Sequence, residues 1–97
     1  MTSKILKYEL PVLEKVSLSL PKNSQIIRCE DVEGKFWIWA IVNLDENQNE
    51  QRHFELYKTG MPIETPLKHL KYLGLCKLFI MQELGLYVFE NISKDLS

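Results

Sequence analysis

Short runs in which apolar and polar residues alternate, divided by turn-forming residues, constrain this chain more than any other feature. In the segment 14–20, Val16, Leu18 and Leu20 alternate with polar residues. This period of two places one face of a strand against a core and the other in water. The proline and asparagine that follow, at Pro21 and in 22–24, predict a turn.

The same pattern recurs along the chain and predicts a mainly β fold. Gly60, Pro62 and Pro66 exclude a long regular element from 59–71, apart from one short helical turn near 66–70. We expect a small antiparallel β-sandwich or partly open barrel of about six to seven short strands with at most one short helix. The expected strands are 5–10, 14–20, 25–32, 35–44, 51–58, 72–80 and 84–92.

Segment 35–44 is the most hydrophobic run, and it is apolar on both faces. Trp37 and Trp39 share one face, and Phe36 and Ile38 begin the other. A strand with two apolar faces is typical of the centre of a sheet that is covered on both sides. The polar loop that follows predicts a hairpin between this strand and 51–58.

The chain has 97 residues, which is the length of one domain, and we treat 1–97 as a single domain with a frayed tail at 93–97. Its net charge of -1 does not favour a protein that is held to nucleic acid by bulk charge. The charge is nevertheless uneven, since 29–55 is acidic and 56–82 is basic. Such blocks either form patches that steer a charged partner or lie on solvated edges and turns.

Cys29 and Cys76 are the two cysteines, and their spacing fits neither a CxxC motif nor a zinc site. We expect two free, buried thiols and a cytoplasmic protein. No catalytic, metal or cofactor motif is recognised: Lys58 and Gly60 do not form a phosphate-binding loop, and a catalytic role for His53 or His69 has no supporting motif. We therefore expect no enzyme activity, no cofactor and no metal.

An ordered set of short segments resembles a family of small proteins from phages and bacteria that is described only as a domain of unknown function. The resemblance covers about residues 4–91 and implies a phage or prophage accessory protein, without any reaction. Relatives often carry histidines where this chain has Met61 and Tyr87, so a histidine-based chemistry would not extend to it. The segments are Lys7–Pro11, Leu20–Pro21, Trp39–Val42, Thr59–Ile63, Tyr72–Gly74 and Val88–Glu90.

The leading hypothesis is a non-enzymatic phage-type protein that binds a host or phage protein in the bacterial cytoplasm and modulates or inhibits a host system such as bacterial defence. Loops held by a rigid sheet often carry function, and tryptophan and tyrosine are frequent at binding hot spots. The candidate partner-binding residues are Thr59, Gly60, Met61, Pro62, Trp37 and Tyr57.

Two other hypotheses remain open. One is a nucleic-acid-binding module that uses the lysine-rich segment 56–77, and the other is a β-barrel that binds a small ligand or nucleotide. A symmetric homodimer, formed by adding strands at an exposed sheet edge, is compatible with the leading hypothesis.

Overall fold

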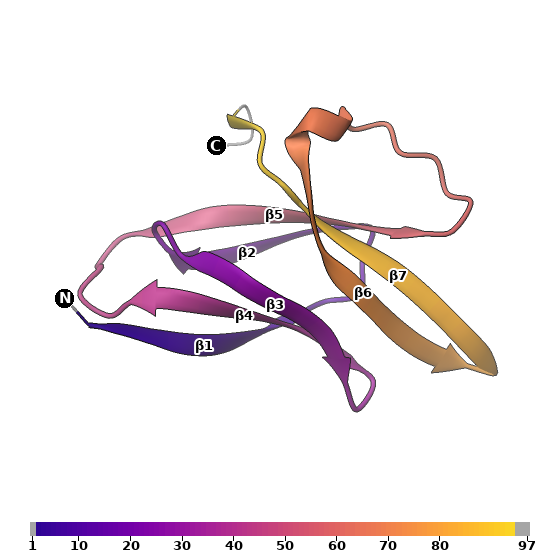
Figure 1. Cartoon of the computed structure of the whole chain (residues 1–97), viewed down its shortest axis with the longest axis horizontal. Coiled ribbons are helices and arrows are strands. Elements are labelled where there is room, and N and C mark those ends of the chain that lie inside the picture. Colours follow the sequence, from indigo (N-terminus) through magenta and orange to yellow (C-terminus); the bar gives the residue numbers. More distant parts are fainter. Residues whose placement is uncertain (1, 95–97) are drawn as a thin grey trace.

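The computed structural model describes residues 2–94, which form seven strands in two antiparallel sheets (Figure 1). Sheet A has the strand order β1-β4-β3, and sheet B has the order β2-β5-β7-β6. A short helical turn, η1, spans Leu67–His69. The strands are β1 Ser3–Leu10, β2 Lys15–Pro21, β3 Gln25–Val32, β4 Lys35–Asn43, β5 Asn49–Lys58, β6 Leu70–Ile80 and β7 Gln82–Asn91.

The expected mainly β fold is confirmed. The two sheets form an open sandwich rather than a closed barrel, and the short helical turn lies where Pro66 predicts it. Of the expected tail at 93–97, residues 95–97 lie outside the described part of the chain. Within residues 2–94, no helix has the length and apolar character needed to span a bilayer.

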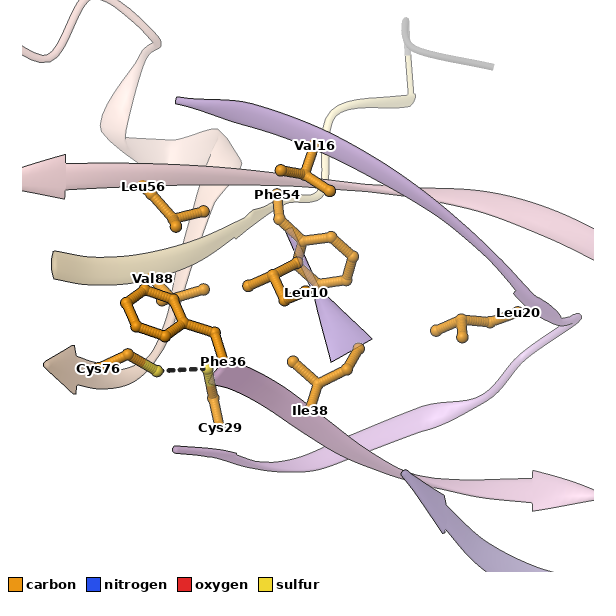
Figure 2. Packing of buried hydrophobic residues seen from close by; sticks show 10 residues of the cluster. All are labelled: Leu10, Val16, Leu20, Cys29, Phe36, Ile38, Phe54, Leu56, Cys76 and Val88. Carbon is orange, nitrogen blue, oxygen red and sulfur yellow. Dashed lines mark hydrogen bonds between the residues drawn. The ribbon is translucent and has the colours of Figure 1, made fainter. Parts of the chain in front are cut away.

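The core lies between the sheets and is built from alternate residues of facing strands. Phe36 and Ile38 of β4 contribute from sheet A, and Phe54, Leu56 and Val88 contribute from sheet B. Figure 2 shows these side chains converging with both cysteines in one cluster. Burial of such side chains stabilises the fold by roughly 1.5–3 kcal/mol each, so one shared cluster can hold two small sheets together.

β4 is the central strand of sheet A, as expected, but it is not covered on both sides. Its inner residues are buried, whereas Trp37 and Trp39 are half-buried on the outer face. The Nζ of Lys7 lies 4.4 Å from the ring centroid of Trp37, and the guanidinium of Arg28 lies 4.2 Å from that of Trp39. Long cationic side chains therefore cover these rings in place of a second layer of protein. The order of apolar and polar residues in the sequence is the same for a face covered in this way and for a face buried in a core.

The expected hairpin between the fourth and fifth strands is wrong. β4 pairs with β1 and β3, whereas β5 pairs with β2 and β7. Both hydrogen-bonding edges of β4 are thus occupied, and the polar segment 44–48 carries the chain from sheet A to sheet B. The apolar faces of β4 and β5 meet across the core rather than along a ladder.

An ion pair closes the end of the core that lies away from the cysteines. The guanidinium of Arg52 donates to the carboxylate of Glu90 at 2.5 Å (Nε) and 3.0 Å (Nη2), and to the backbone carbonyl of Ser24 at 2.7 Å. Both charged side chains are largely shielded from water. This bidentate pair joins β5 to β7 and ties the turn after β2 to sheet B.

Candidate protein-binding surface

The β6–β7 hairpin extends beyond the rest of sheet B. The ladder between β5 and β7 ends at Lys58 and Leu86, whereas β6 and β7 stay paired as far as Ile80 and Gln82. Segments 77–80 and 82–85 thus form a two-stranded ribbon, which projects at the lower right of Figure 1. A two-stranded ribbon is marginally stable in water unless its apolar side chains pack against something.

The end of this ribbon, which we call the hairpin tip, consists of Phe79, Ile80 and Met81. Phe79 is 77% exposed, Ile80 is 66% exposed, and Met81 is fully exposed. Met81 turns the chain with a positive φ of 65°, a conformation that asparagine or glycine adopts more readily. Three consecutive exposed apolar residues at a turn are unusual, because turns normally carry polar residues.

An apolar groove leads from the body of the protein toward the hairpin. Its lining includes Val12 and Leu13 from the β1–β2 connection, Met61 from the loop after β5, and Leu86 from β7, around a cavity of about 180 Å³. Leu86 also contacts the core cluster. The groove therefore borders the core cluster at Leu86.

The loop 59–66 that contributes Met61 is anchored to the outer face of sheet B by one carboxylate. Glu55 is only 4% exposed, and it accepts hydrogen bonds from the hydroxyl of Tyr57, from Thr65 Oγ1 at 2.8 Å and from Asn91 Nδ2 at 2.8 Å. Burial alone would raise the pKa of Glu55, but the three hydrogen bonds outweigh it and hold that pKa below its usual value. The carboxylate therefore stays ionised at neutral pH and fixes the end of the loop.

A cavity of about 500 Å³, lined by both polar and apolar residues, lies beside this anchor. Its lining includes Lys15, Ser17, His53 and His69, and Ser17 Oγ lies 2.8 Å from His53 Nδ1. A serine nucleophile in this kind of pair usually sits at a sharp turn, where backbone N–H groups can hold an oxyanion. Ser17 instead lies within the extended strand β2. Among residues 2–94, no group of three or more His, Cys, Asp or Glu side chains could hold a metal ion.

The structure does not bring all six candidate residues to one place. Thr59, Gly60 and Pro62 are exposed in the loop after β5, and Met61 is partly buried in the apolar groove. Tyr57 is buried, and its hydroxyl donates to the Glu55 carboxylate that anchors the loop. It therefore stabilises the loop and is not exposed for contact with a partner.

Trp37, the remaining candidate, belongs to a different sheet. It lies on the outer face of sheet A under Lys7, whereas the loop and the groove belong to sheet B.

The hairpin tip is absent from the six candidates. A signal for it is visible in the sequence, since Leu78, Phe79, Ile80 and Met81 form an unbroken apolar run. The sequence predicts the turn after this run, either at 82–83 or at 83–85, because Gln82 and Glu83 are polar and Gly85 suits a turn. The structure places the turn at Met81, between the end of β6 and the start of β7.

A protein-family model described as Domain of unknown function (DUF7352) matches residues 1–96. No curated protein and no solved structure matches the chain.

Proposed function

Because the chain belongs to the DUF7352 family, whose description names no activity, we propose a function from its surface: a non-enzymatic module that binds another protein through the hairpin tip and the adjoining groove. The observation that carries this proposal is the projecting ribbon with Phe79, Ile80 and Met81 exposed at its end. An apolar pocket on a partner would remove these side chains from water and stabilise the ribbon at the same time.

The groove gives this surface a second point of contact. Met61, Val12 and Leu13 lie near the base of the ribbon, on the side of Leu86, and Leu13 is 61% exposed. A partner that covers the tip and the groove would also contact the loop 59–66, which the Glu55 anchor holds in position. Preorganisation of this kind lowers the entropic cost of binding.

The resemblance to small phage and bacterial proteins supplies the biological setting of the proposal. In that setting the module acts in the cytoplasm of a bacterial host, covers a surface of a host or phage protein, and thereby modulates or inhibits a host system such as defence. This last step rests on analogy between families rather than on a residue.

A comparison of three protein samples tests the proposal. The tip variant carries Phe79→Thr, Ile80→Thr and Met81→Asn, because threonine suits strands and asparagine suits the positive φ at position 81. The control variant carries Ile5→Thr and Leu67→Thr, which remove exposed apolar side chains elsewhere on the surface. Each sample is used to capture proteins from nuclease-treated bacterial lysate, and a captured protein is then purified and its affinity is measured by calorimetry.

We expect one protein to bind the wild type and the control variant, and to bind the tip variant at least about tenfold more weakly, since hot-spot residues commonly contribute 2 kcal/mol or more. Equal affinity for all three samples would contradict the assignment of the tip. Binding that disappears with nuclease would instead favour the nucleic-acid hypothesis. Light scattering that shows a wild-type dimer and a monomeric tip variant would identify a second copy of the chain as the partner.

A further inference from the structure

The two cysteines, which lie 47 positions apart in the chain, meet between the two sheets. Cys29 lies on β3 of sheet A, Cys76 lies on β6 of sheet B, and their Sγ atoms are 3.7 Å apart. Both are free thiols; Cys29 is 5% exposed and Cys76 is fully buried. Figure 2 shows the two side chains pointing toward one another across the core.

Two contacts hold β3 and β6 together next to this pair. A Cβ atom on Gly74 would lie 2.6 Å from the carbonyl oxygen of Cys29, so the approach requires glycine at this position. On the other side, the backbone N–H of Lys77 donates to Asp31 Oδ1 at 2.8 Å. The thiols are therefore held face to face by one contact at Cys29 itself and by a second contact that follows both cysteines.

The two thiols differ in their readiness to lose a proton. The hydrogen bond between the two sulfur atoms lowers the pKa of Cys29, whereas this bond and burial raise the pKa of Cys76. The thiolate is the nucleophile in thiol oxidation. Cys29 is thus the better nucleophile of the two, and it is also the one with some exposure to solvent.

We propose that Cys29 and Cys76 are an oxidative modification site, in which a small peroxide converts the facing thiols into a disulfide that joins the two sheets. The sulfur atoms need to close from 3.7 Å to about 2.05 Å to form this bond. The site lies within the core, apart from the hairpin tip, and it does not depend on the proposed binding function.

The reaction is balanced with hydrogen peroxide as the oxidant. The Cys29 thiolate attacks one peroxide oxygen, the O–O bond breaks, and the leaving hydroxide takes up the proton that Cys29 had lost, which gives one water molecule and a sulfenic acid at Cys29. The sulfur of Cys76 then attacks the sulfur of Cys29, the S–O bond breaks, and the leaving hydroxide takes the Cys76 proton to form water. Overall, two thiols are oxidised to one disulfide and one peroxide is reduced to two water molecules.

The test treats the folded wild-type protein with hydrogen peroxide and then measures its intact mass, its cross-linked peptides and its thermal midpoint. We expect the loss of two hydrogen atoms, a peptide that links Cys29 to Cys76, and reversal by dithiothreitol. Because the cross-link closes a long loop, the midpoint should rise by roughly 10–20 °C. In a C76S variant, a dimedone adduct should appear on Cys29, because the sulfenic acid then has no thiol to react with.

Three results would overturn the proposal. The first is oxygen addition to either sulfur of the wild type without an intramolecular link. The second is a link between two molecules. The third is thiols that stay reduced in the folded protein but are oxidised when the same sample is unfolded in urea. Since the wild type alone distinguishes these results, the test does not depend on whether C76S folds.

Discussion

At the scale of single residues, the hydrogen bonding of buried side chains is a feature that affects stability. Among the described residues, every buried side-chain nitrogen or oxygen has a hydrogen-bond partner. Glu55 is the clearest case, since one carboxylate satisfies a tyrosine, a threonine and an asparagine from three different segments. A buried polar group that loses its hydrogen-bond partner lowers the free energy of unfolding by more than the intact bond contributes to it. Stability should therefore be sensitive to substitution of Glu55.

Glu55→Gln should lower the free energy of unfolding at pH 7 by about 1–3 kcal/mol, because a neutral amide accepts these hydrogen bonds less strongly. The pKa of Glu55 is lower in the folded protein than its unfolded value of about 4.3. Its contribution is therefore complete above that value and is lost as the pH falls through the folded pKa. Urea denaturation at pH 7 and pH 3 should show a difference between the two proteins that shrinks in acid.

Glu64→Gln is the matched control, because Glu64 is an exposed carboxylate of the same loop. We expect its effect to stay within about 0.5 kcal/mol at either pH. Equal stability of the wild type and Glu55→Gln at pH 7 would remove the anchoring role of Glu55.

At the scale of elements, the strands follow from local patterning and their partners do not. Alternation in 15–20 and the turn pairs at Asn23 and at Glu33–Gly34 are visible in the sequence, and the structure confirms those strands. Pairing depends instead on which strand edges are already occupied. Nothing in the sequence of β5 indicates that it pairs with β2 and β7 rather than with β4.

In the candidate site, too, features set by neighbouring residues are predictable, and features set by residues far apart in the sequence are not. The loop 59–66 is predictable from Gly60 and its prolines, and it is a connection between strands. The anchor joins Glu55 to Thr65 and Asn91, which lie 10 and 36 positions further along the chain. No local sequence pattern can therefore predict it. The extra length of the β6–β7 ribbon depends on where β5 ends, which is a property of the sheet.

Gly74→Ala tests the close contact between β3 and β6. The added Cβ would lie 2.6 Å from a backbone carbonyl oxygen, which cannot move without its strand, so we expect a loss of about 1–3 kcal/mol in urea denaturation. Gly85→Ala is the control, because its Cβ would meet only a terminal carbon of Leu75, at 3.1 Å. A similar effect of both substitutions would contradict a specific role for Gly74.

Hydrogen exchange tests the independence of the ribbon. Amides of 78–85 should exchange faster than those in the paired centre of β5 and β7, since the ribbon has fewer neighbours and more exposed backbone. Binding of a protein partner at the tip should slow the exchange of these same amides. Uniform protection along the whole of β6 and β7 in the free protein would show that the ribbon is not a separate, weaker unit.

At the scale of the whole molecule, two sheets depend on one core. The molecule measures 45 × 32 × 16 Å, so it is a thin slab with little interior beyond the single cluster. Neither sheet can bury its apolar face without the other. The two sheets should therefore unfold together.

The tryptophans make this cooperativity measurable. Both lie on β4, so tryptophan fluorescence reports on sheet A, whereas the larger sheet B contributes most of the far-ultraviolet circular dichroism. We expect the two urea transitions to coincide in midpoint and slope. A fluorescence midpoint well below that of circular dichroism would show that sheet A opens first and that sheet B is stable alone.

The contact between Asp31 and the backbone of Lys77 has a consequence for concentrated solutions. β6 is the outermost strand of sheet B, and fibril growth along such a strand needs an unbroken row of backbone donors and acceptors. Asp31 occupies one donor in that row, at Lys77, and so interrupts the row partway along β6. One carboxylate on a neighbouring sheet thus breaks the continuous template that amyloid-type growth along β6 would need.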